Sequence, residues 1–166
     1  MRTEMQIMVC SPNETDRFAE MIASLVQGGD VIGLIGPLGA GKTRFTQALF
    51  RALGTSDYVR SPSFALVNEY ESHLRLVHMD FYRLDAAEDI FDLGYEEYLS
   101  PDTIVVIEWA DRALEYLPQT RILLTFELVA ENPEARRITL EAVSQRAVMF
   151  VEEVVSRWRC SRSRRV

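Results

Sequence analysis

The sequence predicts an α/β fold built on a central mixed sheet, with antiparallel additions and with helices on both faces. Two continuous apolar runs, "VIGLI" (31–35) and "TIVVIE" (103–108), are typical of central strands that are buried on both faces. Strand-like and helix-like segments mostly alternate in the first part of the chain, whereas strand-like segments follow one another near its end. This order is typical of an α/β sheet with antiparallel additions.

The first elements follow from capping residues and apolar spacing. A short strand is predicted over 5–10, followed by a helix for which Ser11 or Asn13 is the candidate cap and Pro12 suits the first turn. This helix carries an apolar stripe at helical spacing, formed by Phe18, Met21, Ile22, Leu25 and Val26.

The middle of the chain combines a helix, a strand pair and acidic turns. A second helix is predicted over about 42–53, because a glycine follows directly and ends it. Strands are predicted over 64–72 and 74–79, joined by a tight turn near Ser72 and His73. Acid-rich helical turns are expected over 85–99.

The last third is predicted to contain a hairpin between two helices. A short helix is expected over 110–117. The segments 120–129 and 136–143 alternate between apolar and polar residues on either side of "AENPEA", which indicates an antiparallel hairpin. A final helix is predicted over about 144–158.

Length and composition indicate one globular domain. A chain of 166 residues is long enough to bury a core, and 48% hydrophobic with 26% charged residues is typical of a soluble globular protein. We expect a single domain over 1–156 and an arginine-rich, flexible tail over 157–166.

Charge and cysteine content restrict the partners and the compartment. The net charge of −7 argues against DNA as a partner of the whole surface. Cys10 and Cys160 form no C-x-x-C pair, which favours a reducing compartment. No apolar run approaches the roughly 20 residues of a membrane span. We therefore expect a cytoplasmic protein that contacts no membrane.

Residues 36–43, "GPLGAGKT", match the phosphate-binding pattern G-x-x-x-x-G-K-[ST] between a predicted buried strand and a predicted helix. Glycines let the backbone turn tightly so that successive N–H groups point inward, and the helix N-terminus adds positive potential. In this composition, chance would produce such a match roughly 3 times in 10,000. The sequence therefore predicts nucleotide binding on a three-layer P-loop NTPase-like fold.

Lys42 is the only lysine of the chain, and every other basic residue except the histidines is arginine. A compact ammonium on a thin stem can enter the centre of such a loop, whereas the arginine fork suits bidentate partners. We expect Lys42 to reach the β- and γ-phosphates of ATP and the Thr43 hydroxyl to bind Mg²⁺.

A P-loop site needs a further acidic residue on the Mg²⁺ side, usually at the end of another buried strand. Glu108 follows "TIVVI" and Asp80 follows "LRLVHM", although each could be only a solvated turn residue or a helix cap. We favour Glu108 as the metal ligand, directly or through water. Asp80 could hold the water shell of the metal or orient the attacking water.

Other residues have two interpretations each. His78 is either a proton shuttle or a structural histidine. Trp109 either lines the site or belongs to the core, and Arg83 is either a charge-stabilising finger or part of a surface ion pair. The arginine-rich tail could contact RNA phosphates or be a disordered end.

Four segments extend the comparison beyond the loop. "SPSFALVNEY" (61–70), "HMDFYRL" (78–84), "LGYEEYL" (93–99) and "IEWADR" (107–112) occur in the same order and with similar spacing in the TsaE (YjeE) family. Over about residues 10–142 the chain resembles this family of small bacterial P-loop ATPases. The combination of these segments is far more specific than the loop alone.

The resemblance implies a function in tRNA modification. The family acts in the formation of N6-threonylcarbamoyladenosine at position 37 of tRNAs that read codons starting with A. Its members do not transfer the threonylcarbamoyl group themselves; they bind ATP and dock on the complex of the transferase TsaD with TsaB. The resemblance thus implies ATP hydrolysis that is weak alone and stimulated by partners, with tRNA met only through the complex.

The resemblance also implies residue roles. It places phosphate binding on Leu38, Gly39, Ala40, Gly41, Lys42 and Thr43, Mg²⁺ on Thr43 and Glu108, and Asp80 and Trp109 around the active site. It implies switch-like segments that include Ser61, Pro62, Ser63 and His78 and that sense the γ-phosphate. Thr15 and Arg136 match family positions near the adenine.

One departure and two alternatives remain at this point. The family commonly has Asp where Pro37 stands, and proline removes one backbone N–H from the loop. A small P-loop kinase is the alternative enzyme, although the pair Arg136–Arg137 falls in a predicted strand rather than in a phosphate-covering lid. A nucleotide-gated binding module with negligible hydrolysis is the other alternative.

Overall fold

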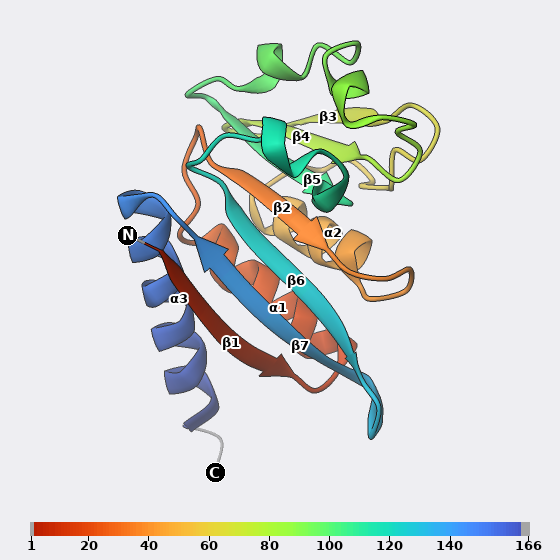
Figure 1. Cartoon of the computed structure of the whole chain (residues 1–166). Helices are drawn as coiled ribbons and strands as arrows, with labels where there is room; N and C mark the ends of the chain where they lie inside the picture. Colours follow the sequence, from red (N-terminus) through yellow and green to blue (C-terminus); the bar gives the residue numbers. More distant parts are fainter. Residues whose placement is uncertain (1, 164–166) are drawn as a thin grey trace.

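The computed structural model describes residues 2–163, which form one seven-stranded mixed sheet with helices on both faces (Figure 1). The strands are β1 (Thr3–Val9), β2 (Val31–Ile35), β3 (Val67–Glu71), β4 (Arg75–Asp80), β5 (Thr103–Glu108), β6 (Ile122–Val129) and β7 (Asn132–Ala142). The helices are α1 (Pro12–Ala23), α2 (Lys42–Ala52) and α3 (Gln145–Ser163), with the 3₁₀ helices η1 (Ala87–Ile90), η2 (Tyr95–Tyr98) and η3 (Ala110–Tyr116).

The sheet is parallel in its centre and antiparallel toward both margins. Its strand order is β1-β7-β6-β2-β5-β4-β3, in which β6, β2, β5 and β4 pair in parallel. Strands β3, β7 and β1 join by antiparallel pairing. The predicted α/β class with a mixed sheet and antiparallel additions is confirmed.

Different helices pack on the two faces of the sheet. Helices α1, α2 and α3 all belong to one apolar cluster, which includes Ile32 of β2 and Val106 of β5. The other cluster joins η1 and η3 to the alternate residues of the same strands, such as Val31 and Val105. Both central strands are therefore buried on both faces, as their continuous apolar sequences predicted.

Helix α1 begins where its capping residues indicate. The Ser11 hydroxyl accepts a hydrogen bond from the Glu14 N–H at 3.2 Å, and the Glu14 carboxylate accepts one from the Cys10 N–H at 2.7 Å. Ser11, rather than Asn13, is thus the cap, and Pro12 occupies the first helical position.

Strand β3 begins later than predicted because a turn precedes it. The Leu66 N–H donates to the Pro62 carbonyl, and Leu66 has a φ of 65°. The Leu66 carbonyl in turn accepts from the Asp80 N–H at 3.1 Å. Residues 64–66 are therefore a turn against the end of β4, and pairing starts only at Val67.

The β6–β7 hairpin is longer than predicted. Strand β7 begins at Asn132 instead of residue 136, so the connection contains only two residues. Pairing continues past Leu128, which lies opposite Arg136, to Val129 opposite Asn132. Pro133 is tolerated there because the β1–β7 pairing ends at Arg136, which leaves β7 with one neighbouring strand.

Helix α3 continues into the segment that we predicted to be a flexible tail. Residues 157–163 are helical, and Trp158 is buried, with its indole N–H donating to the Met8 carbonyl at 3.2 Å. Arg162 donates to the same carbonyl at 2.6 Å. Residues 157–163 of the predicted tail therefore form the end of α3 and pack against β1. Residues 164–166 of the predicted tail lie outside the described residues. Within residues 2–163 no helix is both long and apolar enough to cross a membrane.

Candidate nucleotide-binding site

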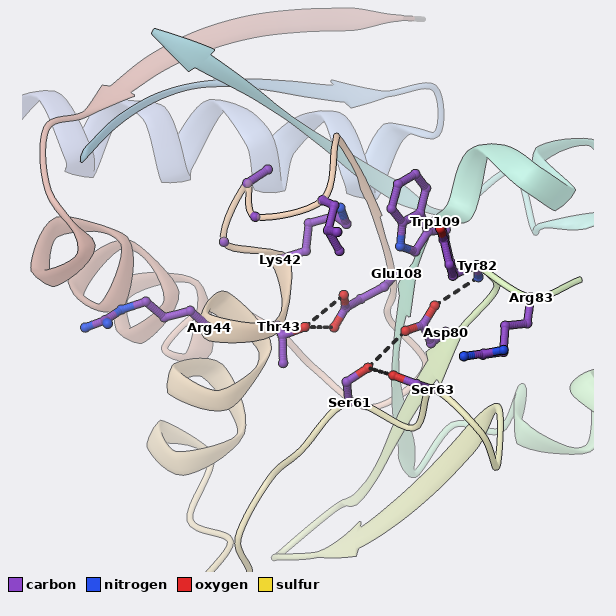
Figure 2. Close-up of a pocket in the computed structure, with 14 residues that line it drawn as sticks. Lys42, Thr43, Arg44, Ser61, Ser63, Asp80, Tyr82, Arg83, Glu108 and Trp109 are labelled. Carbon is purple, nitrogen blue, oxygen red and sulfur yellow. Dashed lines mark hydrogen bonds between the residues drawn. The ribbon is translucent and has the colours of Figure 1, made fainter. Parts of the chain in front are cut away.

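A pocket of about 440 Å³ opens at the carboxyl ends of β2, β4 and β5 (Figure 2). Parallel strands bring their carboxyl ends to one edge, where α/β sheets bind ligands. Its lining comes from the loop before α2, the first turn of α2, the segment before β3, and the ends of β4 and β5 with the residues that follow them. The lining residues are Leu38, Gly39, Ala40, Gly41, Lys42, Thr43, Arg44, Ser61, Ser63, Asp80, Tyr82, Arg83, Glu108 and Trp109.

Two glycines allow the loop between β2 and α2 its shape. Gly36 has a φ of 147°, and a Cβ there would lie 2.6 Å from the Phe126 carbonyl oxygen. Gly41 caps α2 with a φ of 99°, in the left-handed region, without any side-chain cap. The N–H groups of the first turn of α2 therefore remain available at the pocket, where the helix dipole favours an anion.

Lys42 is 4% exposed, with its ammonium held by the loop itself. It donates to the carbonyls of Gly36 and Pro37, the latter at 3.0 Å, and lies 4.2 Å from the centre of the Trp109 ring. Burial lowers the pKa of Lys42, an effect opposed by the negative charges of Glu108, Asp80 and Asp111. Only a slender cation fits this position.

Thr43 and Glu108 meet across the pocket floor. The Thr43 hydroxyl lies 2.8 and 3.0 Å from the two carboxylate oxygens of Glu108, to which it donates (Figure 2). Behind them, His78 Nε2 lies 2.8 Å from Glu108 Oε1. Glu108 is 3% exposed and His78 fully buried.

Asp80 ties the pocket to the loop before β3. Its strand pairs with β5 so that Asp80 lies directly beside Glu108. Its carboxylate accepts from the Ser61 hydroxyl at 2.9 Å and from the Tyr82 N–H at 2.9 Å, and Ser61 contacts Ser63 at 3.0 Å (Figure 2). Asp80 thus connects the segments around Ser61–Ser63 and His78, for which the family resemblance implies a switch-like role.

Aromatic and basic side chains form the rim. Trp109 follows β5 with a φ of 56°, unusual for a non-glycine residue, and its ring centre lies 5.0 Å from that of Tyr82. The Arg83 guanidinium lies 4.6 Å from the centre of the exposed Phe64 ring. Arg83 therefore contacts an aromatic side chain rather than a carboxylate.

Eleven of the predicted site residues line the pocket: Leu38 to Thr43, Ser61, Ser63, Asp80, Glu108 and Trp109. Four do not. Thr15 is buried in the first turn of α1, with its hydroxyl 3.5 Å from the Ser11 carbonyl. The carbonyl of Pro62 accepts a hydrogen bond from the Leu66 N–H. His78 lies behind Glu108 and is therefore not placed to pass a proton directly to a ligand in the pocket. Arg136 lies outside the loop and donates to the carbonyls of Gly39 and Ala40.

Arg44 and Tyr82 also line the pocket, although neither was predicted as a site residue. Their positions offered a signal, since Arg44 follows Thr43 in the first turn of α2 and Tyr82 comes two residues after Asp80. Arg44 makes a bidentate ion pair with Asp16 of α1, at 2.6 and 2.8 Å.

The donor set suits Mg²⁺. Thr43, Glu108 and Asp80 offer only oxygen atoms, which hard cations prefer. Among residues 2–163, no group of three or more His, Cys, Asp or Glu side chains forms a metal cage. Mg²⁺ binds through one or two carboxylates, water and substrate phosphates, which is compatible with these oxygen donors.

The strand–loop–helix geometry and the lysine in the loop define a P-loop protein, the class that binds nucleotide phosphates through this loop. The family model described as "Threonylcarbamoyl adenosine biosynthesis protein TsaE" matches residues 9–152. The chain belongs to the TsaE family.

Individual relatives agree with this assignment. The tRNA threonylcarbamoyladenosine biosynthesis protein TsaE of Bacillus subtilis (strain 168) is 38% identical over 145 residues, 87% of this chain and 89% of the relative. The TsaE protein of Aquifex aeolicus is 39% identical over 136 residues, 80% and 94% of the two chains. A crystal structure of Bacillus subtilis YdiB superposes with a TM-score of 0.80 at 34% identity, covering 95% of this chain and 97% of that one. The predicted family and fold class are confirmed.

Proposed function

We propose that this protein is a cytoplasmic ATPase that binds Mg²⁺-ATP and serves the formation of the threonylcarbamoyl group on adenosine 37 of tRNAs reading codons that start with A. The observation that carries the ATPase part is the contact between the Thr43 hydroxyl and the Glu108 carboxylate beside the P-loop. The tRNA part rests on the family and on the names of its relatives, which are tRNA threonylcarbamoyladenosine biosynthesis proteins.

In this proposal the loop before α2 binds the phosphates. The amides of residues 38–43 and the Lys42 ammonium surround the β- and γ-phosphates, and Lys42 exchanges its bonds to the Gly36 and Pro37 carbonyls for phosphate oxygens. Thr43 and Glu108 would hold Mg²⁺, which would neutralise charge on the phosphate oxygens. Pro37 removes one N–H, but its own carbonyl is a resting partner of Lys42.

Hydrolysis follows from attack of water in line with the bond to the leaving ADP. Lys42 and the loop amides stabilise the charge that develops on the transferred group. Asp80 would hold the water shell of a bound Mg²⁺ or orient the attacking water. It is anchored for this by Ser61 and by the Tyr82 amide, so a change at the γ-phosphate would reach the loop at 61–64.

TsaD and TsaB homologues are the proposed partners, and tRNA is met through their complex. A partner group completes the site in trans, as arginine fingers do in other P-loop enzymes. Exposed apolar side chains at the pocket, Leu38 on the loop and Tyr82 on the rim, suit a surface that another protein covers.

The test is ATP hydrolysis by the purified protein, alone and with the TsaB–TsaD complex and tRNA of the same organism. We expect slow turnover alone and a sharp rise with the partners. Lys42→Ala should abolish it, whereas Arg137→Ala, at an exposed position of β7, should not. A fast rate of ATP hydrolysis that does not change when the partners are added, or the transfer of phosphate to a small acceptor, would instead identify a stand-alone phosphotransferase.

A further inference from the structure

His78 is a fully buried histidine that faces the proposed metal ligand from behind. It lies on β4, two residues before Asp80, and does not line the pocket. Its Nε2 is 2.8 Å from Glu108 Oε1, and on its other side the Phe50 ring of α2 packs edge-on at a centroid distance of 6.2 Å. The imidazole therefore fills the space between the core and the Glu108 carboxylate.

The hydrogen bonds of Glu108 assign the proton of this ring. A carboxylate accepts only, so Nε2 must carry the hydrogen and donate it. Nδ1 is buried and has no hydrogen-bond partner among residues 2–163. The bond to Glu108 is thus the one polar contact that the imidazole makes within the described part of the chain.

This arrangement is costly for a residue that only fills space. A buried nitrogen without a partner lowers stability, and a leucine would fill a similar volume without that cost. The imidazole differs from leucine in one respect that the site can use, namely the N–H directed at Glu108.

That N–H fixes one conformation of a flexible side chain. Oε1 of Glu108 is held from one side by His78 and from the other by the Thr43 hydroxyl, both at 2.8 Å. Oε2 is approached by Thr43 alone, at 3.0 Å. Carboxylates that ligate metals are oriented by such outer hydrogen bonds, whose loss weakens metal binding.

We propose that His78 is a positioning residue, which holds the Glu108 carboxylate in place for Mg²⁺ and the nucleotide through its Nε2–H bond. This inference rests on the proposed Mg²⁺-nucleotide binding of the site. In this role His78 does not touch the nucleotide. We expect it to affect the affinity for Mg²⁺ and to leave the affinity for the nucleotide without Mg²⁺ unchanged.

The experiment measures the affinity of a fluorescent ADP analogue over a series of Mg²⁺ concentrations and in EDTA, together with the melting temperature. His78→Leu should raise the Mg²⁺ concentration for half-maximal affinity about 10- to 100-fold and leave the affinity in EDTA unchanged. His78→Gln, whose amide can donate from a similar position, should restore most of the Mg²⁺ response. His78→Asn, too short to reach Oε1, should behave like His78→Leu and replaces it if that variant does not fold.

Phe50→Leu is the matched control, because it loosens the same part of the core without touching Glu108. It should lower the melting temperature and keep the Mg²⁺ midpoint of the unaltered protein. An unchanged midpoint in both His78→Leu and His78→Asn, or an equal shift in Phe50→Leu, would overturn the positioning role. Failure of the unaltered protein to bind ADP at any Mg²⁺ concentration would overturn the proposed function, and this inference with it.

Discussion

Arg136 and Gly39 are 97 residues apart in the sequence, yet the guanidinium of Arg136 donates to the Gly39 carbonyl at 3.1 Å. The same side chain donates to the Ala40 carbonyl at 3.0 Å. Its other contacts are the carbonyls of Pro133 and Ala135, both at 2.6 Å. Arg136, near the end of the β6–β7 hairpin, thus holds the phosphate loop without lining the pocket itself.

This contact predicts that Arg136 affects nucleotide affinity without touching the pocket. Arg136→Lys keeps the charge but cannot bond both loop carbonyls in the same planar geometry. We expect the dissociation constant of ADP to rise about tenfold, which corresponds to about 1.4 kcal/mol. Titration calorimetry measures this, with Arg137→Lys on the exposed side of β7 as the control. An affinity equal to that of the control would show that the loop keeps its shape unaided.

We expect Lys42 to lower the stability of the folded protein while it serves nucleotide binding. Its pKa is lowered in the folded protein, so the charged form is less favourable there than in the unfolded chain, and Lys42→Met should melt at a higher temperature at pH 7. The unfolded state binds more protons between the lowered pKa and 10.5, so the stability of the unaltered protein rises with pH across that window.

The gain in Lys42→Met should accordingly shrink as the pH approaches 10.5, while nucleotide binding is lost at every pH. Melting curves from pH 7 to about 10.5 test the stability effect, with Arg51→Met at an exposed position of α2 as the control. A lower melting temperature for Lys42→Met at pH 7 would mean that the loop carbonyls outweigh the burial.

Tyr95 predicts a loss of stability in alkali. Burial raises the pKa of Tyr95 to about 12 from its usual value of 10.0, and its hydroxyl is buried without a hydrogen-bond partner among residues 2–163. Between pH 10 and 12 the folded state keeps a proton that the unfolded state has released, so stability falls as the pH rises through this range.

Tyr95→Phe should remove this part of the alkaline slope and be no less stable at pH 7, since it deletes an unpaired buried hydroxyl. Denaturant unfolding at pH 8 and about 11 compares the two proteins. Tyr58→Phe, at a tyrosine that is 82% exposed, controls for the removal of a phenol. Equal alkaline slopes for Tyr95→Phe and the unaltered protein would contradict the prediction.

Trp158 anchors the last turns of α3. Its ring packs on Phe18 at a centroid distance of 5.4 Å and its N–H reaches the Met8 carbonyl. Trp158→Ala should cost about 3–5 kcal/mol of unfolding free energy. The exposed neighbour Arg159→Ala should change it by less than about 0.5 kcal/mol. A similarly small effect at Trp158 would mean that α3 docks without its aromatic contact.

Elements with a strong local pattern were predictable. Strands β2 and β5 have the predicted bounds, because a continuous apolar run requires burial on both faces. The loop residues 38–43 and the strand-end acids Asp80 and Glu108 also come together as expected, since parallel pairing places strand ends at one edge.

Features that depend on distant partners were not predictable. The start of β7 follows from its register with β6, and Arg136 reaches the loop only because that register extends the hairpin. The sequence of residues 157–163 is typical of a polar tail, and the hydrogen bond between Trp158 and Met8 of β1 cannot be predicted from it. The bond between His78 and Glu108 joins residues on two strands, so no local pattern contains it.

The order of strands in the sheet has a consequence for synthesis. Strand β2, which leads into the phosphate loop, lies between β5 and β6, and β1 pairs with β7 from Thr3 opposite Ala142. At about 5–20 residues per second, a ribosome needs several seconds more to supply these neighbours after the loop has emerged. The loop is thus made early but gains its supports, including Arg136, only when the last hairpin arrives. We therefore expect a growing chain to bind nucleotide only after β6 and β7 have joined the sheet.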